Sequence, residues 1–200
     1  MKHQEHIVCV KASHFLDRAN GLADYTLKSD HLILGRRALL ENDPDFRQIL
    51  PEFVLIHKGK VWAYRRAKSG GESRLHGKVA VNVGGHWDLE DLITTNSVID
   101  LEASLENAAQ RELSEEIDVR SSVLSRTQME KCICADDTPV DRLHLAIVYF
   151  IELDGTDVAS KEEQLDAMGF FEPEELLDGD YELETWARIT CEQLIANRKA

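Results

Sequence analysis

The stretch Arg111-Glu112-Leu113-Ser114-Glu115-Glu116-Ile117 carries most of the information in this 200-residue chain. On a helix, Glu112, Glu115 and Glu116 are spaced i, i+3 and i+4, so their side chains project within an arc of roughly 100°. Like charges at this spacing repel one another, and a divalent cation removes that penalty. Mg²⁺ suits carboxylate oxygens and commonly shares its coordination with water and substrate phosphates. The pattern therefore predicts a helical magnesium site.

An acidic face exposed to solvent is the alternative interpretation, and it is common in acidic proteins. The glycine pair upstream of the helix favours the metal site instead. Gly84 and Gly85 end a predicted strand, where glycines permit close approach of a ligand and leave main-chain carbonyls available as ligands.

Taken together, Gly85 and the stretch that begins at Arg111 resemble the Nudix box, whose usual form is G-x5-E-x7-R-E-U-x-E-E-x-G-U, with U an aliphatic residue. All the specified positions of R-E-U-x-E-E are matched, and Val119 supplies the last aliphatic residue. Residues 70–78, with Gly84-Gly85-His86 after them, further resemble a bacterial subgroup of MutT-like phosphoesterases. The resemblance covers residues 48–186.

This resemblance implies an α+β fold, a Nudix-like α/β/α sandwich with a mixed β-sheet. It also implies hydrolysis of a pyrophosphate bond in a nucleoside diphosphate linked to another group. Mg²⁺, or Mn²⁺ in its place, would be held by Gly85, Glu112, Glu115 and Glu116, and Arg111 would orient the glutamates. The general base would be a box glutamate or a loop carboxylate such as Glu163, beside Glu162.

The sequence departs from the motif in three ways. Counting seven residues back from Arg111 reaches Ala103 where the motif has its first glutamate, with Glu102 next to it as a substitute. Twelve residues are inserted, which we place at 86–97. Asp118 replaces the second glycine, and we expect it to adopt the left-handed conformation that ends many helices.

The segment from His57 to Lys78 is basic in an otherwise acidic chain, with seven Lys or Arg and one acid, Glu72. Such a segment attracts phosphates, and arginine can donate two hydrogen bonds to them. We expect the substrate to be bound by Arg65, Arg66, Arg74 and His86. Lys58 and Lys60 lie at a predicted turn and are interpreted as structural.

The composition narrows the function classes. A formal net charge of −14 argues against broad nucleic-acid binding, and no basic helix-turn-helix segment is evident. Four scattered cysteines do not form a disulfide framework, which fits a reducing cytosol. Neither a secretory signal nor an apolar run long enough for a membrane span is present. We therefore expect a cytoplasmic protein that binds a small molecule and neither nucleic acid nor membrane.

The spacing of apolar and polar residues predicts the strands and helices. Residues 53–56 and 61–64 form a predicted hairpin, residues 78–83 a third strand, and residues 123–135 and 140–153 two more. Helices are expected over residues 104–117, 172–177 and 183–197. Residues 1–45 are interpreted as an N-terminal extension packed on the core, and residues 46–200 as the Nudix-like domain.

The sequence is also compatible with two other functions. A module that binds a nucleotide or sugar nucleotide without chemistry would fit the departures from the motif, although it would have little reason to keep three helix carboxylates together. An isoprenoid diphosphate isomerase would need a cysteine at the metal site, and only Cys132 and Cys134 follow the helix. Many relatives pair, so a homodimer is the assembly that the resemblance implies.

Overall fold

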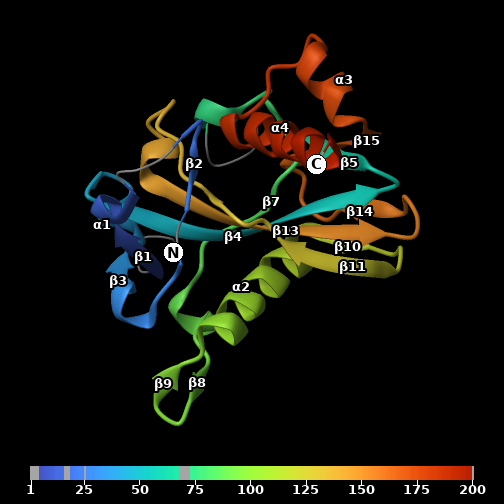
Figure 1. Ribbon diagram of the computed structural model, residues 1–200. Coiled ribbons are helices and arrows are strands. Elements are labelled where there is room, and N and C mark those ends of the chain that lie inside the picture. The colour runs from blue at the N-terminus through green and yellow to red at the C-terminus, as the bar shows by residue number, and fades with distance from the viewer. Residues whose placement is uncertain (1–4, 16–18, 25, 68–72, 200) are drawn as a thin grey trace. The chain divides into compact units, whose positions relative to one another are not determined.

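The computed structural model describes residues 5–15, 19–24, 26–67 and 73–199 (Figure 1). Residues 68–72 of the predicted basic segment, which include Lys68 and Glu72, lie outside these ranges. The chain divides into two compact units, the first made of residues 1–52, 84–112 and 129–148, and the second of residues 53–83, 113–128 and 149–200. Strands β4 (Phe46–His57) and β13 (His144–Leu153) and helix α2 (Leu101–Glu116) each contribute residues to both units.

The first unit is built on the N-terminal strands. Strand β1 (His6–Lys11) pairs antiparallel with β3 (Ile33–Arg36) and with the beginning of β4. Strand β12 (Cys132–Ile133) pairs with β13 and with β2 (Leu22–Ala23). The short helix α1 (Arg37–Leu40) places Leu40 against buried Ile7 and Cys9, so residues before position 45 contribute directly to a hydrophobic core.

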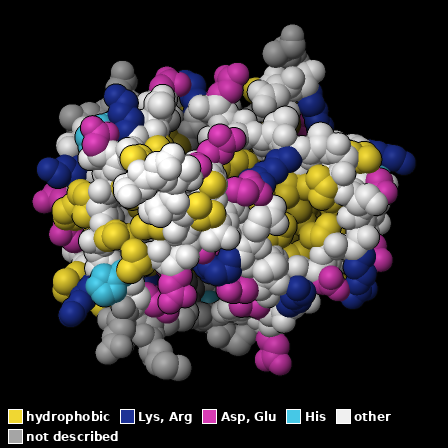
Figure 2. Space-filling model, turned by 90° about the horizontal axis from the view of Figure 1, so that it is seen from below, with side chains coloured by type: hydrophobic (Ala, Val, Ile, Leu, Met, Phe, Trp, Pro, Cys, Tyr) yellow, Lys and Arg dark blue, Asp and Glu magenta, His cyan; other side chains and the backbone are white. Residues whose placement is uncertain are grey.

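A small hairpin precedes helix α2 in the first unit. Strand β7 (Val83–Gly84) leads through the 3₁₀ turn η5 (Leu89–Asp91) to β8 (Thr94–Thr95) and β9 (Val98–Ile99). The two turn residues Asn96 and Ser97 have φ angles of 52° and 63°, which a two-residue hairpin turn of the primed type requires. Val98, in β9, is 61% exposed. Figure 2 shows one face of the molecule, on which hydrophobic side chains, coloured yellow, are visible at the surface.

The second unit contains the predicted central hairpin. Strand β5 (Lys60–Arg66) pairs antiparallel with the end of β4, with β6 (Val79–Ala80) and with β15 (Leu165–Phe171). The hairpin turn places Lys58 and Gly59 at φ angles of 49° and 80°, which explains a glycine here. Trp62 and Tyr64 of β5 are buried.

The remaining elements of the second unit flank these strands. Strand β11 (Val123–Gln128) pairs with β13, and β10 (Ile117–Val119) pairs with β14 (Val158–Ser160). Helices α3 (Pro173–Asp178) and α4 (Thr185–Lys199) lie side by side (Figure 1). None of the helices in the described ranges has the length and apolarity needed to cross a bilayer.

The predicted α+β class with a mixed sheet is confirmed, as are the hairpin and the three helices. The expectation of one strand over residues 123–135 is wrong, because the charged pair Glu130-Lys131 separates β11 from β12. Residues 141–143 form a 3₁₀ turn instead of the start of a strand, so β13 begins at His144.

All four cysteines are free and buried. Burial raises the pKa of the Cys132 thiol and of the Cys191 thiol to about 12. Because the thiolate is the reactive form, we expect negligible labelling of native protein by a maleimide at pH 7, and labelling of all four thiols in denaturant. Rapid labelling of Cys132 in the native state, measured by intact mass, would contradict this burial.

Candidate functional site

Helix α2 carries the three glutamates of the predicted metal site. Its start is capped by Asp100, whose Oδ1 accepts a hydrogen bond from the Ala103 N–H at 3.1 Å. Ser104, Leu105 and Ala108 are buried on the side that faces the core. Side chains at positions 112, 115 and 116 lie near the end of the helix and are only partly buried or exposed. The local sequence thus anchors the start of α2 and leaves its acidic last turn partly accessible.

The glycine pair lies against main chain and against the first of these glutamates. A Cβ atom at Gly84 would lie 2.9 Å from the Cα atom of Glu52. A Cβ atom at Gly85 would lie 2.6 Å from Oε1 of Glu112. Both distances are shorter than a carbon atom tolerates, so any larger residue would displace the strand or the carboxylate. The Glu112 carboxylate therefore rests directly on the Gly85 main chain.

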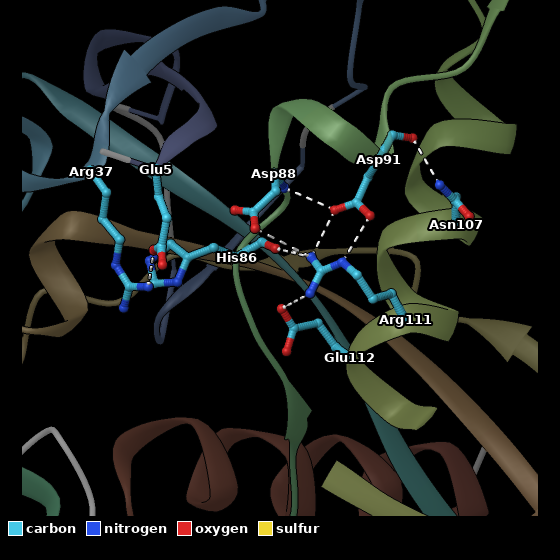
Figure 3. A network of polar contacts seen from close by, with 8 residues as sticks. All are labelled: Glu5, Arg37, His86, Asp88, Asp91, Asn107, Arg111 and Glu112. Atoms are coloured by element: carbon cyan, nitrogen blue, oxygen red, sulfur yellow. Dashed lines mark hydrogen bonds and ion pairs between the residues drawn. The ribbon is translucent and has the colours of Figure 1, made fainter. Parts of the chain in front are cut away.

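Arg111 joins the turn, the 3₁₀ segment and the helix in the first unit, as Figure 3 shows. Its Nε and Nη2 atoms donate to the two carboxylate oxygens of Asp91 at 2.9 and 2.7 Å. Nη1 donates to Oε1 of Glu112 at 2.7 Å, and Nη2 also donates to the His86 carbonyl at 3.0 Å. The hydrogen bond to Asp91 raises the pKa of Arg111, burial opposes this, and Glu112 raises it further. Arg111 is thus held charged and fixed in orientation.

Asp91 occupies the place of the first glutamate of the motif, and the sequence analysis missed it. It lies six positions after Gly85, the spacing that the motif prescribes for that glutamate. Its side chain is almost fully buried and forms the two-pronged ion pair with Arg111. The assignment of this place to Ala103, with Glu102 as a substitute, is wrong, because Ala103 lies in the first turn of α2 and Glu102 is exposed.

The insertion accordingly lies farther along the chain than residues 86–97. Nineteen residues, 92–110, separate Asp91 from Arg111, against seven in the motif. The additional twelve accommodate the β8–β9 hairpin and the first turns of α2. Because the hairpin folds back on itself, Asp91 and Arg111 still meet.

The end of α2 also differs from expectation. Asp118 is not in the left-handed conformation; it lies in strand β10, where it pairs with Ala159. The carbonyls at the end of the helix are bound instead by Lys161, whose Nζ donates to the Ser114 carbonyl at 2.7 Å and whose N–H donates to the Glu116 carbonyl at 2.8 Å. A distant lysine thus performs the capping that the motif assigns to glycine.

Replacing Lys161 with alanine should lower stability by about 0.5–1 kcal/mol, because the ammonium group leaves the last turn of α2 and the main-chain bond remains. Thermal unfolding measures this loss. Lys131→Ala is the matched control, since Lys131 pairs with Asp24 at an exposed site away from a helix end. Equal shifts in the two variants would contradict the capping role.

The remaining predicted acids belong to the second unit. Burial lowers the pKa of Arg66, which is 29% exposed, and the charge of Glu116 is among those that raise it. Glu115 lies on the same helix turn and is exposed. Glu163 is exposed in the short loop that begins at Lys161, and this loop is bonded to the end of α2. The structure thus brings the loop of Glu163 to the end of the acidic helix.

The predicted basic residues have different surroundings. Arg66 donates from Nε to Glu184 at 2.8 Å and lies over the ring of Tyr64. Arg65 donates from Nη1 to the Gly77 carbonyl at 2.9 Å. Arg74 lies exposed in the 3₁₀ turn η4 (Ser73–Leu75). The three arginines belong to the second unit, whereas His86 belongs to the first, next to Gly85 and Arg111.

The donor set suits a hard divalent cation. Carboxylate oxygens and a main-chain carbonyl at a glycine are the ligands that Mg²⁺ accepts, and the Glu112 carboxylate already lies against Gly85. In the described residues, no three His, Cys, Asp or Glu side chains converge as a ready cage. Mg²⁺ tolerates this, since it usually keeps several waters and shares ligands with phosphate.

Comparison with known proteins agrees with this geometry. The NUDIX domain profile matches residues 53–190. The chain belongs to the Nudix family. YmaB from Bacillus subtilis is 31% identical over 163 residues, which cover 80% of this chain and 76% of YmaB. The crystal structure of Tm1382 has the same fold, with a TM-score of 0.74 at 20% identity, over 96% of this chain and 99% of that one.

Within this Nudix chain, the matched region includes Gly85, Asp91 and the whole of α2. The predicted Nudix-like fold is therefore confirmed. The Nudix profile begins at residue 53, so strands β1 to β3, which pack in the first unit, precede it.

Proposed function

We propose that this Nudix protein hydrolyses a pyrophosphate bond in a nucleoside diphosphate linked to another group, with Mg²⁺ or Mn²⁺ as cofactor. The observation that carries the proposal is the Arg111 network, because it joins the His86 carbonyl, Asp91 and Glu112 in one hydrogen-bonded unit. Asp91 supports the proposal, because it is an acid at the position that the motif gives to its first glutamate.

The residues of the proposed site would have three roles: binding the cation, orienting a ligand of the cation, and accepting a proton. Glu112, Glu115, Glu116 and the Gly85 carbonyl would hold the cation, and Arg111 fixes the orientation of Glu112. When bound, Mg²⁺ would neutralise phosphate charge and make a water molecule more acidic. A box glutamate, or Glu163, would accept the proton from the oxygen of the attacking water.

The substrate's phosphates would be bound by basic side chains. Arg65, Arg66 and Arg74 are assigned this role because they belong to the basic segment, and Arg74 is the most accessible of them. His86 would contact the substrate beside the glycine turn. A small molecule is thus the expected partner, with action in the cytoplasm and a homodimer as the assembly.

The test is a screen of nucleoside diphosphate derivatives with Mg²⁺ or Mn²⁺, in which released phosphate is read after coupling to a phosphatase. We expect turnover of at least one derivative, abolished by EDTA and restored by excess metal. Metal-dependent binding without turnover would overturn hydrolysis and leave the non-catalytic module. The isomerase alternative gains no support from Cys132, since burial raises the pKa of its thiol to about 12.

A further inference from the structure

The hairpin of β8 and β9 belongs to the insertion within the motif, and the proposed hydrolysis gives it no role. Its segment, residues 92–99, reads Leu-Ile-Thr-Thr-Asn-Ser-Val-Ile and lies between Asp91 and Asp100. These eight residues carry no charged side chain, although 30% of the residues in the chain are charged. Five of the eight are β-branched, the class of side chain that suits a pleated, half-buried surface.

The base of this hairpin is fixed to the start of α2, within the first unit. The Asp100 N–H donates to the Ile93 carbonyl at 2.9 Å, and the Ile93 N–H donates to Oγ of Ser104 at 2.8 Å. The Ser104 hydroxyl, which is fully buried, also donates to the Asp100 carbonyl at 2.6 Å. Figure 1 shows the two strands extending away from the helix beyond this anchor. The hairpin is therefore a held projection from the unit.

One face of the hairpin is turned toward solvent. Thr95 pairs with Val98, and Thr94 pairs with Ile99. Because side chains alternate along a strand, Thr95 and Val98 share one face, while Thr94 and Ile99 share the other. Ile99 is half-buried, whereas Val98 is among the most exposed large apolar residues of the described chain. Ile93, two positions before Thr95, is also exposed. We call Ile93, Thr95 and Val98 the outer hairpin face.

The edges of the hairpin are unprotected. Strands β8 and β9 form a two-stranded sheet, and no third strand pairs with it in the described part of the chain. A two-stranded hairpin by itself is marginally stable in water and gains stability from a further strand or a packed face. Proteins usually protect such edges with lysine, proline or other charged residues, and residues 92–99 contain none of these. The hairpin thus has the character of a surface that another surface covers.

The charge of the chain favours a second copy as the partner. With a formal net charge of −14, two copies repel one another over most of their surfaces, so a contact between copies requires an uncharged patch. In a two-fold contact the same patch meets itself, and a neutral β-branched face is complementary to its own copy. A basic partner would instead be recognised by acids, which residues 92–99 lack.

We propose that the outer hairpin face is the contact between two copies of this chain, with Ile93, Thr95 and Val98 of each copy packed against the same face of the other about a two-fold axis. The proposal deepens the homodimer of the proposed function and does not depend on hydrolysis. A contact built from so few residues lies at the small end of interface sizes, so we expect a dissociation constant of about 1–100 µM.

The first experiment is sedimentation equilibrium of the full chain at concentrations on both sides of the expected dissociation constant. Val98→Lys places two like charges near the axis, and we expect it to raise the dissociation constant about tenfold or more. Val123→Lys is the matched control, because Val123 is 57% exposed against 61% for Val98 and lies in a strand of the second unit. Equal dissociation constants for the two variants, or an unmodified chain that stays monomeric throughout, would overturn the proposal.

The second experiment does not depend on how well Val98→Lys folds. All four native thiols are buried, so Thr95→Cys supplies a single accessible thiol on the outer hairpin face. A disulfide requires the two Cβ atoms within about 4.5 Å of one another. With copper-catalysed air oxidation, we expect a covalent dimer from Thr95→Cys to form at least about ten times faster than from Ser125→Cys, an exposed position in β11.

The outcomes separate this contact from the rest of the proposed function. Equal cross-linking rates for Thr95→Cys and Ser125→Cys would overturn the hairpin contact. An unmodified dimer that persists in Val98→Lys would do the same and leave a homodimer with another interface. A nucleotide screen without turnover would remove hydrolysis alone, because the hairpin contact is measured by mass and cross-linking, without substrate or metal.

Discussion

Glu116→Gln should lower metal-dependent turnover by about 100-fold or more while the melting temperature stays within about 3 °C of the unmodified protein. The amide keeps the shape of the side chain but loses the negative charge that a hard cation requires. Stability is nearly unaffected for two reasons. Repulsion within the acidic turn is relieved, and Arg66, which feels the charge of Glu116, retains its ion pair with Glu184.

Steady-state rates over a range of Mg²⁺ concentrations, on a derivative found in the screen, measure this effect. Glu102→Gln is the matched control, because Glu102 is an exposed glutamate in the first turn of the same helix. The control should retain full activity. Turnover that survives in Glu116→Gln at every metal concentration would remove Glu116 from the cation site.

The acidic helix was predictable because the pattern that indicates it lies within one short stretch of sequence. The i, i+3, i+4 spacing of Glu112, Glu115 and Glu116 requires only a helix, and apolar residues on the other face supply one. The hairpin at Lys58-Gly59 was predictable for the same reason, since two strand-forming runs flank a turn with positive φ angles.

Asp91 was missed because the count ran backward from Arg111 through an insertion of unknown place. Counting forward from Gly85 crosses no insertion and reaches an acid at the prescribed sixth position. An aspartate is one methylene shorter than the expected glutamate, which also weakened the signal. A sequence-only search that applied the spacing from each end of the motif would have found the residue.

Lys161 could not be found by either count. It lies 47 positions from Ser114, and the two meet only because β14 pairs with β10 at the end of the helix. The same pairing draws Asp118 into a strand and removes the need for a left-handed residue. Contacts that depend on strand pairing across such distances have no local pattern in the sequence.

Asp91→Asn should have the second large effect, on stability and activity together. Asp91 is almost completely buried, and its carboxylate accepts hydrogen bonds from Nε and Nη2 of Arg111. The neutral amide therefore leaves a partly buried guanidinium without its main counter-charge. Breaking such a pair costs several kcal/mol, and because Arg111 is 28% exposed and keeps Glu112, we expect about 2–3 kcal/mol, or about 5–10 °C in melting temperature. Turnover should fall about 10- to 100-fold through lost orientation of Glu112.

Asp91→Glu separates the two consequences, because it restores the charge that the motif usually carries at this place. We expect it to recover most of the turnover even if packing of the longer side chain in η5 costs some stability. Asp88→Asn is the neighbouring control: its carboxylate lies 3.8 Å from Arg111, beyond hydrogen-bond distance, so the loss should be much smaller. If Asp91→Asn has the melting temperature and the metal-dependent turnover of the unmodified protein, the ion pair with Arg111 does not organise the site. Another residue of the chain must then correspond to the first glutamate of the motif.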